Sequence, residues 1–129
     1  MTRIHYDNHQ ATITNDVGMT ATGFNGDIDA QGFRPKELLE AAVALCMTMN
    51  VRKVLERDGI DFRLEDVAAT ATASKEDGIT NRFTTIDVEL TLPAHLEAAY
   101  RTKLIKIAER GCTIGNTIKA SASISVTEA

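Results

Sequence analysis

The sequence has few of the residues on which several classes of protein depend. Its 129 residues include two cysteines, two prolines and no tryptophan, and acidic residues outnumber basic ones by 18 to 14. The resulting net charge of −4 is unfavourable for binding to nucleic acid or to an anionic membrane surface, because both need clustered cations. Four Phe and two Tyr also leave little material for stacking on bases. We therefore expect neither nucleic acid nor a membrane as a partner.

Long apolar stretches are missing as well. Residues 1–10, MTRIHYDNHQ, contain no apolar segment like that of a secretory signal, and no run reaches the roughly 18 apolar residues that span a bilayer. The sequence thus predicts a cytoplasmic protein. In that compartment, cysteines are more often free thiols, catalytic groups or metal ligands than partners in a structural disulfide.

The chain is long enough for one domain, and no linker or repeat of fixed period divides it. We therefore expect residues 1–129 to form a single domain. Its first part, residues 10–28, holds two strand-like pieces, ATIT and MTATGF, with turn-forming pairs such as Asn15-Asp16 and Asn25-Gly26 between and after them.

A long helix is predicted next. Pro35 suits a first helical turn, and Gly59 suits the position after a last one. Within this helix, residues 41–47 (AAVALCM) are apolar on every side, which is typical of a buried helix. Because one short chain has little with which to cover such a helix, we expect a homodimer in which two copies complete each other's cores.

Strands and a second helix follow. Residues 67–74 alternate in part, and residues 85–92 alternate clearly, between apolar and polar side chains. The sequence predicts a second helix opened by Pro93 and stopped by Gly111, then a short helical turn, and a half-buried final strand over 120–127. This order of elements predicts an α+β domain.

The two cysteines, Cys46 and Cys112, allow two interpretations. In one, they form a redox pair in which one thiolate attacks an electrophile and the other thiol resolves the product as a disulfide. In the other, both are small buried apolar residues, and apolar burial makes a thiol inert. Cys112 has the better local setting for a thiolate, because it follows Gly111 and precedes a predicted helical turn with free backbone N–H groups.

The charges nearest before Cys46 in the sequence are Arg34, Lys36, Glu37 and Glu40. On a straight helix, Lys36 lies about 15 Å from Cys46 along the axis, at a rise of about 1.5 Å per residue. Arg34 and Lys36 could therefore act on this thiol only across a dimer interface or through a folded-back loop. The alternative is that they are solvated charges at a helix start.

Metal and nucleotide chemistry find little support in the sequence. His5 and His9 have an i, i+4 spacing, but they lie in a strand-like region without the intervening Glu of a zincin, and His95 stands alone. No glycine-rich phosphate-binding motif and no GxSxG motif occurs. We therefore predict that the protein binds no metal and no cofactor. The alternative, a metal-binding protein that uses the His and Cys residues, is a third hypothesis for the function.

Three stretches of the sequence resemble the OsmC/Ohr family: RPKELLEAAVALCMTMNVRKVLERDGI, then ITNRFTTIDVELTLP, then IAERGCTIGNTIKASASISV. The likeness runs from about residue 24 to the C-terminus. It rests on a helix that begins at Pro35 and carries Cys46 in its middle, and on Cys112 at the opening of a short turn before the last strand.

The resemblance implies an intertwined α+β homodimer with antiparallel strands, a long buried central helix and two active sites at the subunit interface. It also implies reduction of organic hydroperoxides by a peroxidatic cysteine. A second cysteine resolves the product as a disulfide, which a dithiol of the lipoyl type reduces. By position, Cys46 is similar to the peroxidatic cysteine and Cys112 to the resolving one. An apolar pocket around Cys46 would suit an alkyl or fatty-acid hydroperoxide.

The sequence departs from the family pattern at two places. Catalytic members carry Glu directly after the helix-starting Pro, whereas this chain has Lys36 there and Glu37 one position on. They also carry an Arg in the N-terminal strand region that polarises the thiolate, whereas this chain has no Arg between Arg3 and Arg34. We predict Arg34 or Lys36 of the partner chain as the cationic helper and count Glu37 among the candidate catalytic residues. The alternative function is a non-catalytic OsmC-like dimer that binds a small apolar ligand or senses redox state.

Overall fold

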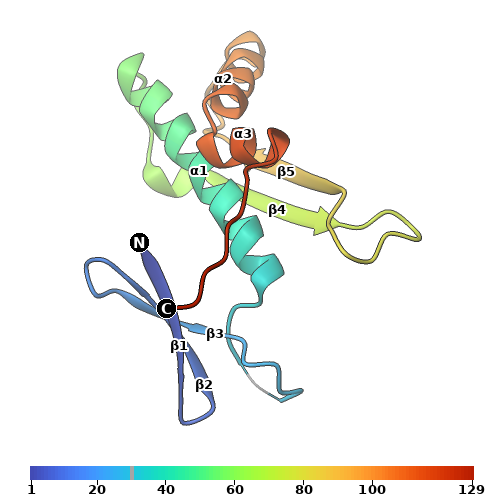
Figure 1. Cartoon of the computed structure of the whole chain (residues 1–129). Helices are drawn as coiled ribbons and strands as arrows, with labels where there is room; N and C mark the ends of the chain where they lie inside the picture. Colours follow the sequence, from blue (N-terminus) through green and yellow to red (C-terminus); the bar gives the residue numbers. More distant parts are fainter. Residues whose placement is uncertain (30) are drawn as a thin grey trace. The chain divides into compact units, whose positions relative to one another are not determined.

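The computed structural model describes residues 1–29 and 31–129. Within them the chain is mixed α+β, with five strands, three α-helices and one 3-10 turn (Figure 1). This confirms the α+β part of the predicted fold class. The chain divides into two compact units, residues 1–39 and residues 40–129. None of the helices in the described residues is long and apolar enough to cross a membrane.

The first unit is built on a three-stranded antiparallel sheet. Its strands pair in the order β1 (Thr2–Asp7), β2 (Gln10–Asn15), β3 (Thr20–Gly23). Asn15 holds the turn between β2 and β3, because its side-chain oxygen accepts hydrogen bonds from the backbone N–H groups of Val17 and Met19. The two predicted strands and the predicted turn at Asn15 are confirmed.

The longest element, α1, spans Pro35–Arg57. At its start the backbone N–H of Arg34 donates to the carboxylate of Glu37 at 2.7 Å, as in the returning half of a capping box. At its end Gly59 adopts a left-handed φ of +67°, and the N–H groups of Gly59 and Ile60 bond back to the last turn of the helix. The predicted start and stop of this helix are therefore confirmed.

The second unit holds most of the buried apolar residues. Its elements after α1 are the 3-10 turn η1 (Leu64–Asp66), the antiparallel hairpin β4 (Ala68–Ser74) and β5 (Thr85–Thr91), and the helices α2 (Ala98–Arg110) and α3 (Thr113–Lys119). Along β5 every second side chain is half-buried, which confirms the predicted alternation. The main buried cluster joins the second half of α1 to α2 and the turn before it: Val51, Val54, Leu55, Leu96, Leu104 and Ala108.

The second helix begins later than predicted. The sequence predicted a start at Pro93, whereas α2 begins at Ala98. The cause is Arg101, whose guanidinium donates to the carbonyl of Pro93 at 2.6 Å and, through Nε, to that of Leu96 at 2.9 Å. These side-chain contacts hold the preceding residues as a turn.

The predicted final strand over 120–127 is wrong for this chain. Helix α3 ends at a turn in which Ser121 has a φ of +56°, and residues 122–129 have no regular structure. Ile124 and Val126 are exposed. A strand is stable only when its backbone groups find a partner. In the described part of the chain, no strand pairs with this segment.

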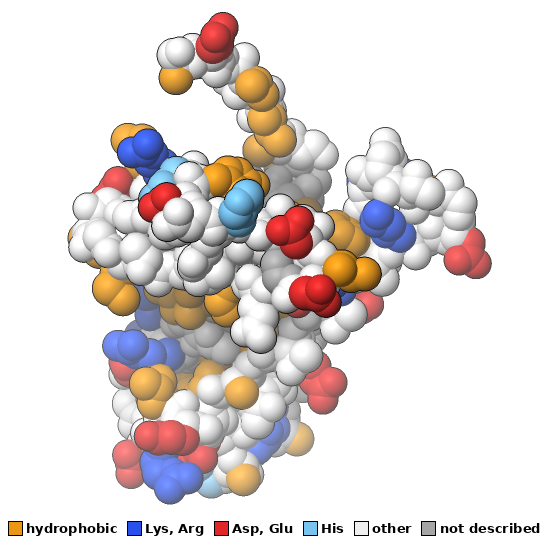
Figure 2. Space-filling view, turned by 90° about the horizontal axis from the view of Figure 1, so that it is seen from below, with side chains coloured by type: hydrophobic (Ala, Val, Ile, Leu, Met, Phe, Trp, Pro, Cys, Tyr) orange, Lys and Arg blue, Asp and Glu red, His pale blue; other side chains and the backbone are white. Residues whose placement is uncertain are grey.

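A single chain buries only part of α1. Val51 and Leu55 are fully buried, whereas Leu45 is 62% exposed and Met49 is 47% exposed. Burial on every side, as the apolar segment of this helix predicts, would need a second chain. On the face drawn in Figure 2, apolar side chains reach the surface among scattered charges of both signs.

Candidate active site

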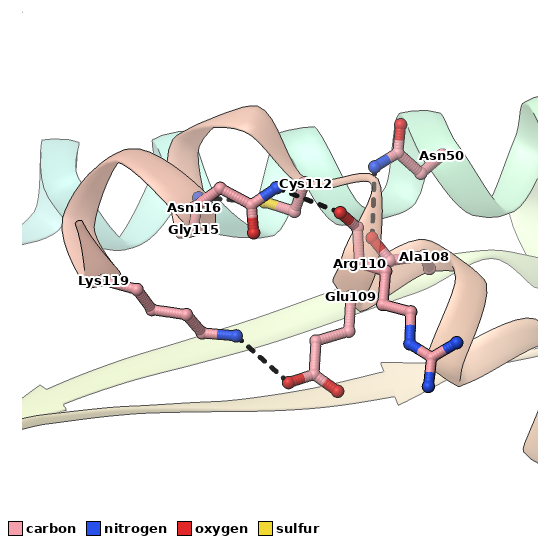
Figure 3. A network of polar contacts seen from close by, with 8 residues as sticks. All are labelled: Asn50, Ala108, Glu109, Arg110, Cys112, Gly115, Asn116 and Lys119. Atoms are coloured by element: carbon pink, nitrogen blue, oxygen red, sulfur yellow. Dashed lines mark hydrogen bonds and ion pairs between the residues drawn. The ribbon is translucent and has the colours of Figure 1, made fainter.

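Cys112 lies at the corner between α2 and α3. Only Gly111 and Cys112 separate the two helices, and Cys112 is the N-cap residue of α3. Its side chain is fully buried, and its sulfur accepts a hydrogen bond from the backbone N–H of Gly115 at 3.2 Å (Figure 3). The backbone of the corner therefore fixes the position of this thiol.

Cys46 lies in the middle of α1 and is partly exposed. The backbone N–H of Ile114, in the first turn of α3, has the largest influence on this thiol and lowers the pKa of Cys46. Partial burial raises the pKa, while a hydrogen bond with the Cys112 thiol, the backbone N–H of Thr113 and the charge of Lys53 lower it further. The net effect is a thiol whose pKa lies below its ordinary value.

The pKa of Cys112 shifts in the opposite direction. Burial raises the pKa of this thiol most, and the neighbouring Cys46 raises it further, although the backbone N–H groups of Gly115 and Ile114 lower it. Helical N–H groups were expected to favour a thiolate at Cys112. Those groups do lower the pKa of Cys112, but burial outweighs them, so the net shift there is upward, while the amide of Ile114 also lowers the pKa of Cys46. The structure thus brings the two predicted cysteines together as free thiols.

Two further residues of α1 belong to the surroundings of Cys46, and the sequence reasoning missed both. Asn50 donates from its side-chain amide to the backbone carbonyl of Ala108 at 3.1 Å, which links α1 to the end of α2. Lys53 supplies the positive charge that acts on Cys46. Residues four and seven positions apart lie on one face of a helix, so this spacing from Cys46 is the signal that could have found them.

A cavity of about 530 Å³ lies beside this site, between α1, the hairpin and the helices α2 and α3. Its walls are mainly apolar and include Met47, the neighbour of Cys46 in the chain, and Gly115, the neighbour of Cys112 in space. The ion pair between Lys119 and Glu109, at 3.2 Å, also lines it (Figure 3). The cavity is large enough for a small apolar ligand.

The other predicted site residues lie at the start of α1, in the first unit. The guanidinium of Arg34 lies 4.7 Å from the centre of the Phe24 ring, and the backbone N–H of Arg34 bonds to Glu37. Lys36 is exposed in the first turn. These contacts give Arg34 and Glu37 local structural roles, and the catalytic roles of all three residues stay predictions.

The histidines do not share a helix face. His5 lies in β1, and His9 lies in the turn after it with a φ of +61°. Within residues 1–29 and 31–129, no group of three or more His, Cys, Asp or Glu side chains is placed to hold a metal ion.

The sequence comparisons bear on the resemblance to the OsmC/Ohr family. A family model described as OsmC-like protein matches residues 26–127, a span that includes both cysteines. The chain belongs to the OsmC-like family. The resemblance predicted from the sequence is therefore confirmed. Comparison with curated proteins gives no match.

Solved structures of the OsmC-like family share this fold. An OsmC-like protein from Mycoplasma pneumoniae is 15% identical, with a TM-score of 0.78 over 94% of this chain and 87% of that one. An organic hydroperoxide resistance protein from Legionella pneumophila is 19% identical, with a TM-score of 0.66 over 92% and 88%. The organic hydroperoxide resistance protein OhrB of Bacillus subtilis is 18% identical, with a TM-score of 0.59 over 94% and 92%. At these identities the likeness establishes the fold alone.

Proposed function

We propose that this OsmC-like protein is a thiol-dependent peroxidase that reduces organic hydroperoxides in defence against oxidative stress. Cys46 would be the nucleophile and Cys112 the resolving thiol. The observation that carries the proposal is that each of these thiols alters the pKa of the other, which is lowered at Cys46 and raised at Cys112. The thiolate is the reactive form of cysteine, whereas a resolving thiol can stay protonated until it is needed. The Legionella and Bacillus relatives are both named organic hydroperoxide resistance proteins, which supports the same substrate class.

The proposed reaction has three balanced steps. First, the Cys46 thiolate attacks the outer peroxide oxygen, the O–O bond breaks, and the alkoxide takes up a proton and leaves as an alcohol. This step leaves Cys46 as a sulfenic acid. Second, the sulfur of Cys112 attacks that of Cys46, which forms a disulfide and releases water. Third, an external dithiol gives two electrons and two protons to the disulfide and becomes a disulfide itself.

The apolar cavity supports an organic substrate over hydrogen peroxide. Its walls include Val43 and Met47 on α1, on either side of Cys46 in the sequence, and Val88 and Leu90 on β5. Apolar walls favour an alkyl group, because burying it removes apolar surface from water. Hydrogen peroxide has no such group and would gain nothing from this cavity.

A homodimer is part of the proposal. Leu45 and Met49, one turn apart on α1, stay exposed in the single chain. Apolar side chains grouped on a helix face are commonly covered by another molecule, and a second copy of this chain would cover these.

We propose two sources for the positive charge that stabilises the Cys46 thiolate. Lys53 of the same chain supports the Cys46 thiolate with its charge. In a homodimer, Arg34 or Lys36 of the partner subunit would add a second cation, with Glu37 beside it. We place this chemistry in the reducing cytoplasm, where dithiol reductants keep such cysteines cycling.

One observation favours a different function. In the described structure the cavity is walled by residues next to the cysteines, such as Met47 and Gly115, and not by the sulfur atoms themselves. A non-catalytic dimer that binds a small apolar ligand there, or senses redox state through its thiols, is the second candidate.

The deciding experiment is mass spectrometry of the reduced protein after brief exposure to cumene hydroperoxide or to hydrogen peroxide. We expect rapid formation of a Cys46–Cys112 disulfide, faster with the organic peroxide. Cys112→Ser should stop at a sulfenic acid on Cys46, which a dimedone probe traps, and Cys46→Ser should give neither product. If the thiols stay reduced, or oxidise slowly and equally with both peroxides, the peroxidase proposal is refuted. The second candidate, a protein that binds a small apolar ligand, then remains.

A further inference from the structure

Each of the last four backbone carbonyls of α2 accepts a hydrogen bond. The last four carbonyl groups of an α-helix have no partner within the helix. In α2 two of them accept backbone N–H groups of the corner, from Gly111 to Ile107 and from Cys112 to Glu109. The other two accept side-chain amides (Figure 3).

Those two amides differ in origin. Asn116 of α3 donates to the carbonyl of Arg110 at 3.0 Å, which closes the corner onto itself. Asn50 donates to the carbonyl of Ala108 at 3.1 Å and is partly buried, and it comes from α1, on the other side of the site. Of the four contacts at this helix end, the one made by Asn50 is the one that fixes the corner to the helix carrying Cys46.

Asn50 also lies against the corner itself. A methyl group built on Gly111 would come within 3.4 Å of the Asn50 side-chain nitrogen. Asn50 and Cys46 are one helical turn apart and face the same side of α1. The Asn50 side chain thus contacts the carbonyl end of α2, and the pKa of Cys46 is lowered by backbone amides in the first turn of α3.

We propose that Asn50 is the positioning residue of the Cys46 site: by holding the Ala108 carbonyl, it fixes the first amides of α3 against the Cys46 thiol. The inference rests on the proposed function of Cys46 as the reacting thiol. The geometry gives the reason. Only Gly111 and Cys112 connect the two helices, so a contact that fixes the end of α2 also fixes the start of α3. The influence of the Ile114 amide on Cys46 depends on that placement.

The test is the pH profile of Cys46 alkylation by iodoacetamide, resolved by peptide mass spectrometry so that both cysteines stay native. In Asn50→Leu, which keeps the branched shape and the number of heavy side-chain atoms but removes the amide, we expect the Cys46 pKa to rise by about one unit. Below the pKa this lowers the alkylation rate about tenfold. Asn50→Gln, which keeps an amide donor, should recover part of that loss.

Asn116→Leu is the matched control, because it removes an equivalent amide-to-carbonyl bond from the same corner without touching α1. An unchanged Cys46 profile in folded Asn50→Leu, or an equal shift in Asn116→Leu, would overturn the inference. Should Asn50→Leu fail to fold, Asn50→Ser, which is too short to reach Ala108, decides by the same measurement. The assay uses no peroxide. The wild type could therefore fail to reduce hydroperoxides while Asn50→Leu still raises the Cys46 pKa. That pair of results would refute the proposed function and still support the positioning role of Asn50.

Discussion

Cys46 and Cys112 each alter the pKa of the other, and the pKa values of the two thiols move in opposite directions. The amide of Ile114 favours the thiolate of Cys46, whereas burial keeps Cys112 protonated. A proton shared between two like groups in this way resides mainly on one of them. The fold thereby gives two chemically identical side chains different surroundings, which favour a thiolate at Cys46 and a protonated thiol at Cys112.

We expect native Cys46 to be alkylated at lower pH than Cys112. The pKa of Cys46 is lowered from its ordinary value and that of Cys112 is raised, so the two rate profiles should separate along the pH axis. Iodoacetamide labelling across a pH series, read out by peptide mass spectrometry, measures both at once. In urea the two profiles should converge, since neither thiol then has its folded surroundings. Coinciding profiles in the native protein would contradict the assignment.

The contribution of Lys53 should be separable by salt. Its charge acts on Cys46 through space, and Lys53 is exposed, so solvent weakens the effect. Lys53→Gln should raise the Cys46 pKa by less than about 0.7 unit, and the difference from wild type should vanish near 1 M salt. The alkylation profile measures the change, with Lys106→Gln on α2 as a control that removes the same charge elsewhere. A difference that persists in high salt would mean that Lys53 acts by packing.

Much of the fold could be predicted from local sequence signals. Pro35 and Gly59 mark the ends of α1 because each acts through its own backbone. The ring of Pro35 fixes its φ angle at a helical value, and Gly59 adopts a left-handed φ that ends the helix. The alternation along β5 likewise reports one half-buried face. The start of α2 could not be predicted, since Arg101 overrides the helix-start signal of Pro93 through contacts further along the chain.

The candidate site could be predicted only in part. Cys46 and Cys112 were found because cysteine is rare in this sequence and because they match a family pattern. The effect of each cysteine on the other's pKa, the role of the Ile114 amide and the link from Asn50 to Ala108 depend on how the α2–α3 corner meets α1. No local sequence pattern encodes that arrangement. The final strand was predicted only from the alternation of apolar and polar side chains. Such alternation indicates a preference for strand structure but does not supply a neighbouring strand to pair with.

Tyr100 predicts how stability changes at high pH. Its hydroxyl donates to Asp58 at 2.8 Å, and burial, together with that carboxylate, raises the pKa of Tyr100 to about 12. A folded-state pKa above the unfolded value of about 10 means that the native protein holds the proton longer. The stability that Tyr100 contributes is therefore complete below about pH 10 and is lost as pH rises through about 12.

Ultraviolet titration of the tyrosines tests this expectation. The chain has two Tyr, so a step near pH 12 is resolvable, and Tyr100→Phe should remove it. Urea midpoints at pH 9 and pH 11 should fall more steeply with pH in wild type than in Tyr100→Phe. A step near pH 12 that remains in the variant would assign it to another group.

Leu55 should be among the most costly residues of α1 to truncate. It is fully buried in the cluster that joins α1 to α2, so Leu55→Ala should lower the free energy of unfolding by about 2–5 kcal/mol. Leu64, at 59% exposed, is the matched control, and Leu64→Ala should change stability by less than about 0.5 kcal/mol. Urea denaturation measures both. Equal losses would mean that burial in this cluster does not determine the stability.

The exposed face of α1 predicts the oligomeric state. Leu45 and Met49 expose apolar side chains from one face of the helix. In a homodimer that covers them, a carboxylate at either position would be buried without a partner, which costs more than the lost apolar contact. Leu45→Glu combined with Met49→Glu should therefore convert a dimer of the 14.0 kDa chain into a monomer, as measured by light scattering after size exclusion.

Leu64→Glu, which adds the same charge at an exposed leucine in η1, should leave the dimer intact. A wild-type protein that is monomeric at micromolar concentration, or a double variant that remains dimeric, would show that this face is not the interface. The predicted helper cation from the partner subunit would then need another route to Cys46.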